Sequence, residues 1–389
     1  MQTLDERYSL FPPNGKDAWT AQLEKELKGQ PLTNLHWEIE PGLPLAPLYT
    51  VEDRPTWHEP LQTAHREGRW QVAERIEVED TAAANALAVA AVQGGADALS
   101  LPLRHKPAAH TLGSLLDGVD PGRCSLHFGE YYEDKDPLGF LRLFAAYLQQ
   151  EGLHPQQVQG SLDFDPLLDW TEPPIQALAD AIRFCFVALP RFKCLQINGW
   201  CFFASPGNTS TELATILAKG AEYLARLQKA GVPAVTAQPF IQCSVAIGPS
   251  YFLEIAKLRA LRLLWAQMLQ GFGVQSPQPL TLVVHFAPET QGEDPYSNMI
   301  RATTQALSAV IGGADRLHVL PADAYTGQPP SDFTRRIARN VQHLLRLESF
   351  LDKTVDPAAG SYYIETLTEQ LALKAWDKFV ELDSARAFG

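Results

Sequence analysis

The chain has 389 residues, of which 46% are hydrophobic, enough to build the core of one large domain or of two to three average ones. Its net charge of −13 and the absence of a basic cluster argue against nucleic-acid binding and against attraction to an anionic membrane surface. No apolar run approaches the roughly 20 residues of a membrane helix, and MQTLDERYSLF lacks a signal pattern, so we expect a cytoplasmic protein.

Residues 1–68 are predicted to form an N-terminal arm rather than part of a barrel. A helix is expected over residues 17–27, with Trp19, Leu23 and Leu27 on one face. The rest of the arm is rich in aromatic residues and poor in regular structure. Such side chains need a surface to cover, which is either the chain's own barrel or another chain.

From Trp70 onward, short apolar strands alternate with helices. The strands are predicted over residues 70–78, 98–103, 123–129, 158–164, 193–199, 234–242, 280–286 and 316–320. The helices are predicted over residues 80–93, 111–116, 138–150, 174–188, 209–229, 251–270, 294–311 and from about 332 onward. Eight such units over residues 69–350 indicate a closed TIM (β/α)8 barrel, with a doubly wound open sheet as the rival.

Residues 351–389 follow the predicted barrel. DKTVDPAAGSYYIE is rich in turn-forming residues and should cross the barrel surface, and a last helix over residues 365–382 should pack on the barrel.

Helical periodicity also assigns details within these helices. Phe186 should face inward on the helix 174–188, and Tyr296 and Ile300 should do so on the helix 294–311. Thr209 and Glu212 have the spacing of a capping box at the start of their helix.

Candidate chemistry is sought at the carboxyl ends of the strands, where α/β barrels carry their active sites. Asp163 and Asp165 follow the fourth strand and would act as a pair, or else form a turn before Pro166. His127 lies at the end of the third strand and is either a base or a hydrogen-bonded core residue. Cys201 follows the fifth strand and is either a nucleophile or an inert thiol.

The cysteines and known motifs add no further site. The number of cysteines is odd and no two of them form a CxxC pair, which predicts reduced, mostly buried thiols: Cys124, Cys185, Cys194, Cys201 and Cys243. The chain has no HExxH, no GxSxG, and no GxGxxG followed by an acid. We therefore predict no metal site.

Four long runs resemble the barrel of the methylmalonyl-CoA mutases. They are AIGPSYFLEIAKLRALRLLWAQML, DPYSNMIRATTQALSAVIGGADRLHV, RRIARNVQHLLRLES and DKTVDPAAGSYYIETLTEQLALKAW, and they cover well over half of residues 246–376. The arm is similar to the N-terminal arm of mutase subunits, which wraps a partner. The resemblance implies a barrel from a family that rearranges acyl-CoA esters with adenosylcobalamin.

The same resemblance implies that the pocket of an active mutase is degenerate in this chain. Cys201 takes the place of the catalytic His of an SGYH run, and Phe240 that of the substrate-binding Arg of an RLSFF run. Arg75 replaces a tyrosine that shields the radical, and Asp163 replaces a Gln of the fourth strand. An arginine after the fourth strand has no counterpart in TEPPIQALAD.

Two larger parts also depart from the family. The segment that threads coenzyme A into the barrel is reduced to RPTWHEPLQTAHREGR, and the DxHxxG run of the cobalamin-binding domain is absent. We therefore expect no catalytic, cofactor-binding or metal-binding residue in this chain. Bulky apolar residues after the fifth strand are expected to fill the barrel axis.

The function implied by this resemblance is that of a non-catalytic small subunit of a heterodimeric mutase, or of its barrel fragment. A large catalytic partner would hold adenosylcobalamin and interconvert methylmalonyl-CoA and succinyl-CoA. The alternative is an acyl-CoA mutase of altered specificity that takes cobalamin from a separate chain. A third possibility, with no supporting motif, is a barrel with another reaction that uses His127, Asp163, Asp165 and Cys201.

Overall fold

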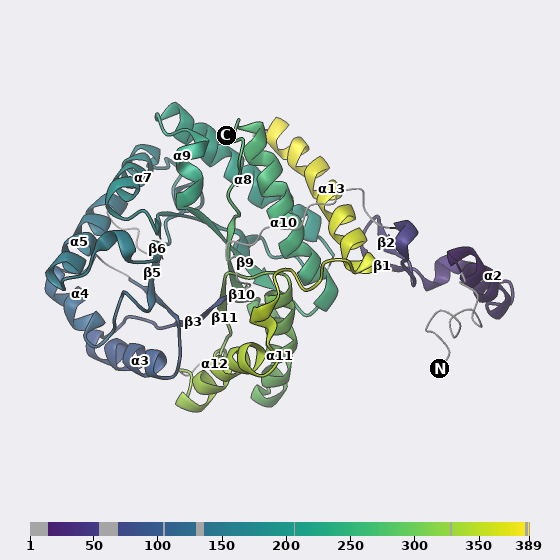
Figure 1. Cartoon of the computed structure of the whole chain (residues 1–389), viewed down its shortest axis with the longest axis horizontal. Helices are drawn as coiled ribbons and strands as arrows, with labels where there is room; N and C mark the ends of the chain where they lie inside the picture. Colours follow the sequence, from purple (N-terminus) through teal and green to yellow (C-terminus); the bar gives the residue numbers. More distant parts are fainter. Residues whose placement is uncertain are drawn as a thin grey trace, which may run out of the picture.

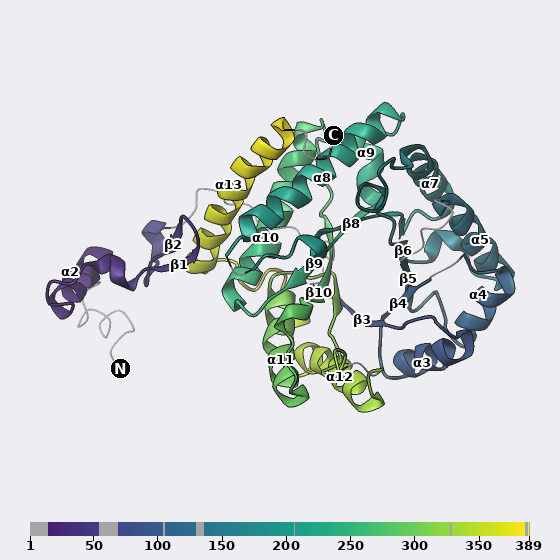
Figure 2. The ribbon, with the colours of Figure 1, turned by 180° about the vertical axis from the view of Figure 1, so that it is seen from behind.

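A ring of parallel strands forms the centre of the molecule, with helices around its outside (Figures 1 and 2). The computed structural model describes residues 15–53, 69–103, 106–129, 136–205, 207–326, 329–385 and 388. The strands of the ring are β3 (Gln71–Arg75), β4 (Ala98–Pro102), β5 (Ser125–Gly129), β6 (Gly160–Leu162), β7 (Phe192–Lys193), β8 (Leu195–Asn198), β9 (Ile241–Ile247), β10 (Thr281–Phe286) and β11 (Arg316–His318).

The ring closes at its fifth strand, which is divided into β7 and β8. The strands follow the order β7-β6-β5-β4-β3-β11-β10-β9-β8, so the two halves lie at the two ends of one parallel ladder. Backbone hydrogen bonds join this strand to its neighbours on both sides. The Cys194 N–H donates to the Phe240 carbonyl before β9 at 3.1 Å, and the Gln196 N–H donates to the Phe164 carbonyl after β6 at 3.2 Å. The predicted TIM barrel is confirmed, and the doubly wound open sheet is excluded.

The helices begin where the sequence supplies N-caps. The side chains of Asp80, Asp136, Asp294 and Ser331 each accept a hydrogen bond from an N–H of the first turn. The helices of the barrel and its C-terminal extension are α3 (Thr81–Gln93), α4 (Ala109–Leu116), α5 (Pro137–Gln150), α6 (Pro166–Asp169), α7 (Ile175–Ala188), α8 (Thr209–Lys229), α9 (Ala234–Ala237), α10 (Tyr251–Gly271), α11 (Pro295–Ile311), α12 (Asp332–Leu347) and α13 (Tyr362–Ser384).

The main core lies between the ring and these helices. Successive side chains of a strand point to opposite faces, so every second residue faces outward. Leu99, Leu126, Ile197, Leu282 and Leu317 are fully buried on this outward side and belong to one continuous hydrophobic cluster. The cluster explains why the strands read as apolar in the sequence.

The predicted sixth strand, over residues 234–242, is wrong for most of its length. Residues up to Phe240 form α9 and the 3₁₀ turn η5 (Gln238–Phe240), and the strand β9 runs from Ile241 to Ile247. Pro233 precedes α9, and Pro239 stands in η5. Because a proline lacks the N–H that a central strand requires, it favours a turn here.

Two details of the helices α7 and α8 also differ from the prediction. Phe186 is 61% exposed, because α7 buries Leu178, Ile182 and Cys185 instead. The predicted capping box at α8 does not form: Asn208 is the N-cap residue, the Thr209 hydroxyl has no partner within the described chain, and Glu212 is buried. In each case tertiary packing decided the orientation of the helix.

The helix α11 is rotated relative to the predicted face. It buries small and polar side chains, Ala302, Gln305 and Ala306, against the barrel. Tyr296 and Ile300 consequently point outward and are 75% and 72% exposed.

The arm contacts the barrel only in part. Its elements are α2 (Lys16–Glu26), η1 (Leu32–Leu35), β1 (Trp37–Glu40), β2 (Leu43–Leu45) and η2 (Val51–Asp53). The buried Glu40 of the β1–β2 hairpin lies 2.8 Å from Lys374 of α13 and accepts from Ser210 of α8. Further out, α2 has no buried residue and lies away from the barrel (Figures 1 and 2). The stretch 54–68 and residues 1–14 lie outside the described residues.

A buried ion cluster joins α8 to α10. The ammonium of Lys257 lies 2.7 Å from a carboxylate oxygen of Glu254 and 3.4 Å from one of Glu212, and all three side chains are fully buried. Burial, opposed by Lys257, raises the pKa of Glu212 to about 7.

No helix within the described ranges is long and apolar enough to cross a bilayer.

Because the folded chain holds the Glu212 proton up to about pH 7, it binds more protons than the unfolded chain, whose carboxyl titrates near 4.5. The free energy of unfolding should therefore fall as pH rises through this window, by on the order of 2 kcal/mol. Glu212→Gln should remove this pH dependence. Urea unfolding at about pH 5 and at about pH 7 measures the difference in the free energy of unfolding between the two conditions. The exposed Glu381→Gln serves as control, and an unchanged pH slope in the Glu212 variant would contradict the assignment.

Candidate functional site

The carboxyl ends of the strands open onto a cavity of about 500 Å³ on the barrel axis. Polar side chains from most of the strands line it, with Trp200, Leu320 and Tyr325 near its rim. The polar lining residues are Arg75, Ser100, His127, Ser161, Asp163, Asp169, Gln196, Asn198, His285, Arg316 and His318.

Strand register brings these residues together. Arg75, Ser100, His127 and Ser161 are paired in sequence along β3, β4, β5 and β6 and therefore share the inward face. On the other side of the ring, His285 pairs with His318 and with Ala246. Serines and an alanine at inward positions leave room where other TIM barrels are filled by bulky branched residues.

The expectation that apolar side chains fill the axis is wrong for the described residues. The run after the fifth strand forms a 3₁₀ turn, η4 (Gly199–Phe202), and only Trp200 of this turn lines the cavity. Trp200 is itself exposed, at the rim. The period of two within each strand separates polar from apolar residues, but only the pairing of the strands decides which of the two sets faces the axis.

A chain of hydrogen bonds holds the side chains along one wall. Nε2 of Gln242 donates to Oε1 of Gln196 at 2.5 Å, and Nε2 of Gln196 donates to Asn198 Oδ1 at 2.8 Å. Ser244 Oγ donates to the same oxygen at 2.9 Å, and Asn198 Nδ2 donates to Asp163 Oδ1 at 2.8 Å. Because each member is bonded to the next, this wall is fixed in orientation.

The strands β5, β10 and β11 carry three histidines and an arginine on their inward faces. Nη1 of Arg316 lies 2.8 Å from Nε2 of His127, whose ring nitrogens also contact Ser125 and Ser161. The rings of His285 and His318 stack with centroids 4.6 Å apart. Burial lowers the pKa of His285 to about 3 and the pKa values of the other two imidazoles well below their usual value, so all three are neutral at pH 7.

Two of the four degenerate pocket positions line this cavity. Arg75 lies at its mouth with Nε 2.7 Å from a Glu77 oxygen, and Asp163 joins the wall described above. Cys201 is exposed in η4 and does not line the cavity, and burial raises the pKa of its thiol. Phe240 is buried before the start of β9, at the other end of the barrel, and packs on Phe186.

Asp163 and Asp165 do not form an acid pair. Asp165 is fully buried and turns away from the cavity to accept from Lys219 Nζ and the Tyr223 hydroxyl, both at 2.5 Å, and from the Asn198 N–H at 2.7 Å. Its carboxylate holds α8 to the fifth strand. Only Asp163 reaches the cavity.

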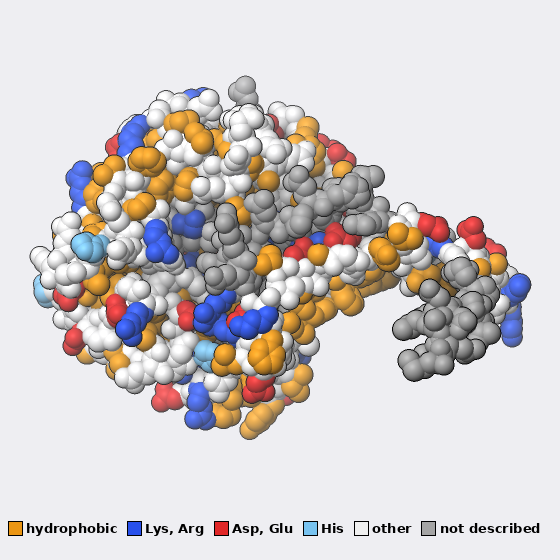
Figure 3. Space-filling view, in the orientation of Figure 1, with side chains coloured by type: hydrophobic (Ala, Val, Ile, Leu, Met, Phe, Trp, Pro, Cys, Tyr) orange, Lys and Arg blue, Asp and Glu red, His pale blue; other side chains and the backbone are white. Residues whose placement is uncertain are grey.

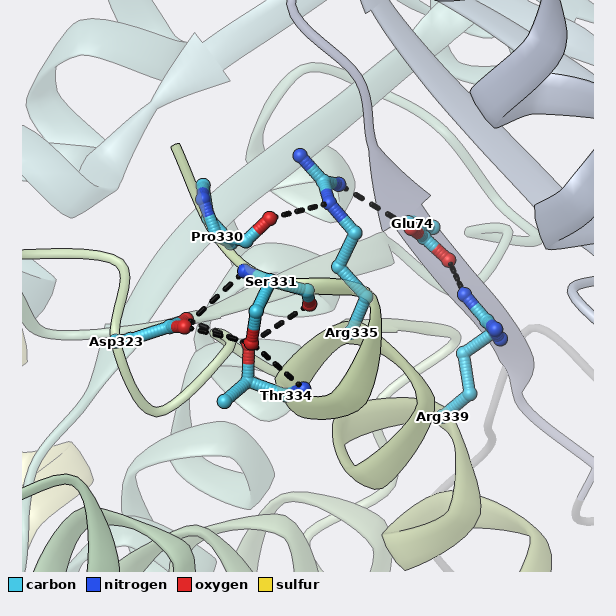
Figure 4. A network of polar contacts seen from close by, with 7 residues as sticks. All are labelled: Glu74, Asp323, Pro330, Ser331, Thr334, Arg335 and Arg339. Carbon is cyan, nitrogen blue, oxygen red and sulfur yellow. Dashed lines mark hydrogen bonds and ion pairs between the residues drawn. The ribbon is translucent and has the colours of Figure 1, made fainter. Parts of the chain in front are cut away.

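The loop between β11 and α12 carries Tyr325 to the rim, and Asp323 fixes this loop (Figure 4). The Asp323 carboxylate accepts from the Ser331 N–H at 3.1 Å and from the Thr334 hydroxyl at 2.6 Å. The following turns of α12 carry Arg335 and Arg339, which both bond to Glu74 of β3. Since proximity in sequence does not indicate these contacts, Tyr325 was not predicted as a rim residue.

Comparison with known proteins identifies similar chains. A family model described as methylmalonyl-CoA mutase matches residues 108–386. The methylmalonyl-CoA mutase small subunit of Porphyromonas gingivalis is 33% identical over 98% of the chain and 65% of its own length. The small subunit of Streptomyces virginiae is 32% identical over 89% and 58%, and the methylmalonyl-CoA mutase of Escherichia coli is 35% identical over 64% and 36%. The chain thus spans about two thirds or less of each of these relatives.

Proposed function

The chain belongs to the methylmalonyl-CoA mutase family, and on that premise we propose that it is the small, non-catalytic subunit of a heterodimeric mutase, or the barrel part of such a subunit. Its partner would be a large catalytic subunit that interconverts methylmalonyl-CoA and succinyl-CoA. The names of two relatives that align with most of the chain, both small subunits, support this role.

The observation that carries the proposal is the uncovered apolar surface of the arm. Leu35 and Trp37 are exposed on the arm, Trp37 by 55%, although large apolar side chains gain free energy by leaving water. In Figure 3 hydrophobic side chains continue along the edge of the molecule between the arm and α11, where Tyr296 and Ile300 are exposed. A surface of this kind is typical of an interface with another protein.

The placement of Cys201 supports a non-catalytic role. The resemblance pairs this position with a catalytic histidine, whereas the thiol lies outside the cavity and has a raised pKa. A thiol of this kind is protonated at pH 7 and would not act in place of an imidazole.

We place adenosylcobalamin in the partner, because the imidazoles that line the cavity of this chain are engaged with other side chains. The cavity imidazoles are held inside the barrel by stacking or by hydrogen bonds, and His127 and His318 are buried. We therefore assign no step to this cofactor here.

The test is association with a catalytic mutase subunit of greater length. Leu35→Glu combined with Trp37→Glu should raise the Kd of the complex by about 100-fold, because charged groups would replace apolar anchors. Isothermal titration calorimetry measures the effect. Phe186→Glu is the matched control, since Phe186 is also exposed, by 61%, but lies on α7, on the far side of the barrel from the arm (Figure 1). An unchanged Kd in the arm variant would contradict the proposed interface.

The open cavity, which has both polar and apolar side chains on its walls, favours the alternative of an acyl-CoA mutase of altered specificity that takes cobalamin from a separate chain. Turnover of acyl-CoA esters by the isolated chain with added adenosylcobalamin separates the two functions. The subunit role predicts no turnover until the partner is added. Turnover by the chain alone would establish the alternative.

A further inference from the structure

The charges on the described walls of the cavity at the carboxyl ends of the strands are balanced. The lining has two cationic side chains, Arg75 and Arg316, and two anionic ones, Asp163 and Asp169. Partial burial and the charge of Asp165 raise the pKa of Asp169 to about 6, which leaves this carboxyl mostly ionised at pH 7. The three imidazoles are neutral at that pH. Because a charged ligand would lose its hydration without meeting a net opposite charge, this cavity favours a neutral ligand.

The same walls offer both donors and acceptors of hydrogen bonds. A side-chain amide has two N–H donors. The hydrogen bonds of Gln196 and Asn198 to described residues use one N–H of each amide, toward Asn198 Oδ1 and Asp163 Oδ1. His318 also lines the cavity and is 5% exposed, and its Nδ1 has no partner among the described residues. A hydroxyl both donates and accepts and therefore matches every one of these groups, whereas a carboxylate or a phosphate only accepts.

Two aromatic rings stand at the rim of this cavity. Trp200 is 46% exposed and Tyr325 is 55% exposed, although aromatic side chains gain free energy by leaving water. Trp200 follows Asn198 by two residues, in the turn η4, so the indole and the amides belong to one strand end. Asp323 fixes the loop that carries Tyr325 (Figure 4). An aromatic face beside fixed polar groups matches a ring with C–H groups on its faces and hydroxyls on its edge.

We propose that the cavity binds a neutral monosaccharide. The sugar ring would stack on Trp200, and its hydroxyls would bond to Asn198, Gln196 and Asp163. The volume of about 500 Å³ lies within the range of small-molecule pockets, roughly 300–1,000 Å³. This binding goes beyond the subunit role and does not depend on it. It also differs from the acyl-CoA alternative, whose ligand carries several negative charges.

Ligand-detected NMR titration of the full chain tests the site with D-glucose, D-galactose and D-mannose. At least one of these sugars should bind saturably, with a Kd on the order of 1 mM, since a ligand of this size makes few contacts. The amino sugar and the uronic acid of the same configuration are matched charged probes. Each should bind at least about 10-fold more weakly, because it adds one charge to a balanced cavity. Absence of saturable binding by all three neutral sugars would overturn the proposal, as would tighter binding of either charged probe.

Competition with succinyl-CoA separates the sugar site from the acyl-CoA alternative. Succinyl-CoA should not displace the bound sugar. Displacement with an affinity greater than that of the sugar would assign the cavity to an acyl-CoA ester and would also overturn the proposal. Failure of sugar binding leaves the association with a catalytic subunit unaffected, because the arm variant tests that association separately.

Variants locate the site. Trp200→Ala should weaken sugar binding about 5- to 10-fold, because the stacking surface is lost. Trp37→Ala is the matched control, since Trp37 is 55% exposed on the arm and does not line the cavity. Asn198→Ala should weaken binding several-fold, and if circular dichroism shows that it does not fold, Trp200→Ala decides the question. Unchanged affinity in Trp200→Ala would place the sugar elsewhere and contradict the proposal.

Discussion

Replacement of Asp165 by alanine is expected to lower the free energy of unfolding by about 3–5 kcal/mol, which is typical of breaking a buried ion pair. The Asp165 carboxylate is fully buried between Lys219, Tyr223 and the Asn198 N–H. Without it, the Lys219 ammonium would be buried with no other ion-pair partner among the described residues. Charge burial, more than the loss of contacts, accounts for the size of the effect.

Urea unfolding monitored by circular dichroism measures the change. Asp180→Ala is the control, because Asp180 pairs with Arg183 on the exposed surface of α7. This substitution should lower the free energy of unfolding by less than about 1 kcal/mol. Lys219→Met added to Asp165→Ala should recover part of the loss, since it removes the uncompensated charge. A loss below about 1 kcal/mol in the single variant would contradict the role assigned to Asp165.

Arg259→Leu is expected to lower the free energy of unfolding by a similar amount, about 3–5 kcal/mol, and to destabilise the C-terminal segment before the rest of the barrel. Arg259 lies buried on α10 and pairs with Asp356 and with Glu365, whose oxygen is 3.0 Å away. Asp356 belongs to the crossing that leads into α13, and Glu365 belongs to the first turn of α13. Because α13 in turn holds Glu40 and Asp53 of the arm through Lys374 and Thr366, the substitution should also loosen the attachment of the arm.

Hydrogen exchange of the α13 amides tests this order of events, and urea unfolding tests the magnitude. The substitution should accelerate the exchange of the α13 amides more than that of the α3 amides, because α3 packs elsewhere on the barrel (Figure 1). Arg183→Leu provides a control on an exposed ion pair. Equal acceleration in α3 and α13 would show that Arg259 supports the whole barrel rather than the C-terminal segment.

Much of the fold could be predicted from local pattern. Asp80, Asp136 and Asp294 cap their helices, and the ends of α3 and α11 agree with the glycine pairs that follow them. One exception was the sixth strand, where Pro233 and Pro239 outweighed the apolar character of residues 234–240. A pattern of apolar residues cannot by itself separate a short strand from a short helix.

The site could be predicted only in part. Asp163 was recognised at a strand end and Arg75 by resemblance, and both line the cavity, because the carboxyl ends of parallel strands meet at one end of a barrel. Cys201 and Phe240 were recognised by resemblance and lie outside it. Arg316 and His318 were overlooked, since nothing local distinguishes an inward from an outward position on a three-residue strand.

The sequence by itself determined the alternation of strands and helices, the closed barrel and the family to which the chain belongs, because caps, breakers and apolar runs act over a few residues. Only the tertiary structure decided what occupies the barrel axis. The pairing of β3 to β6 and of β9 to β11 places serines, histidines and Arg316 on the inner face. Because a shift of register by one residue would exchange the two faces of a strand, the polarity of the axis depends on how all the strands pair at once.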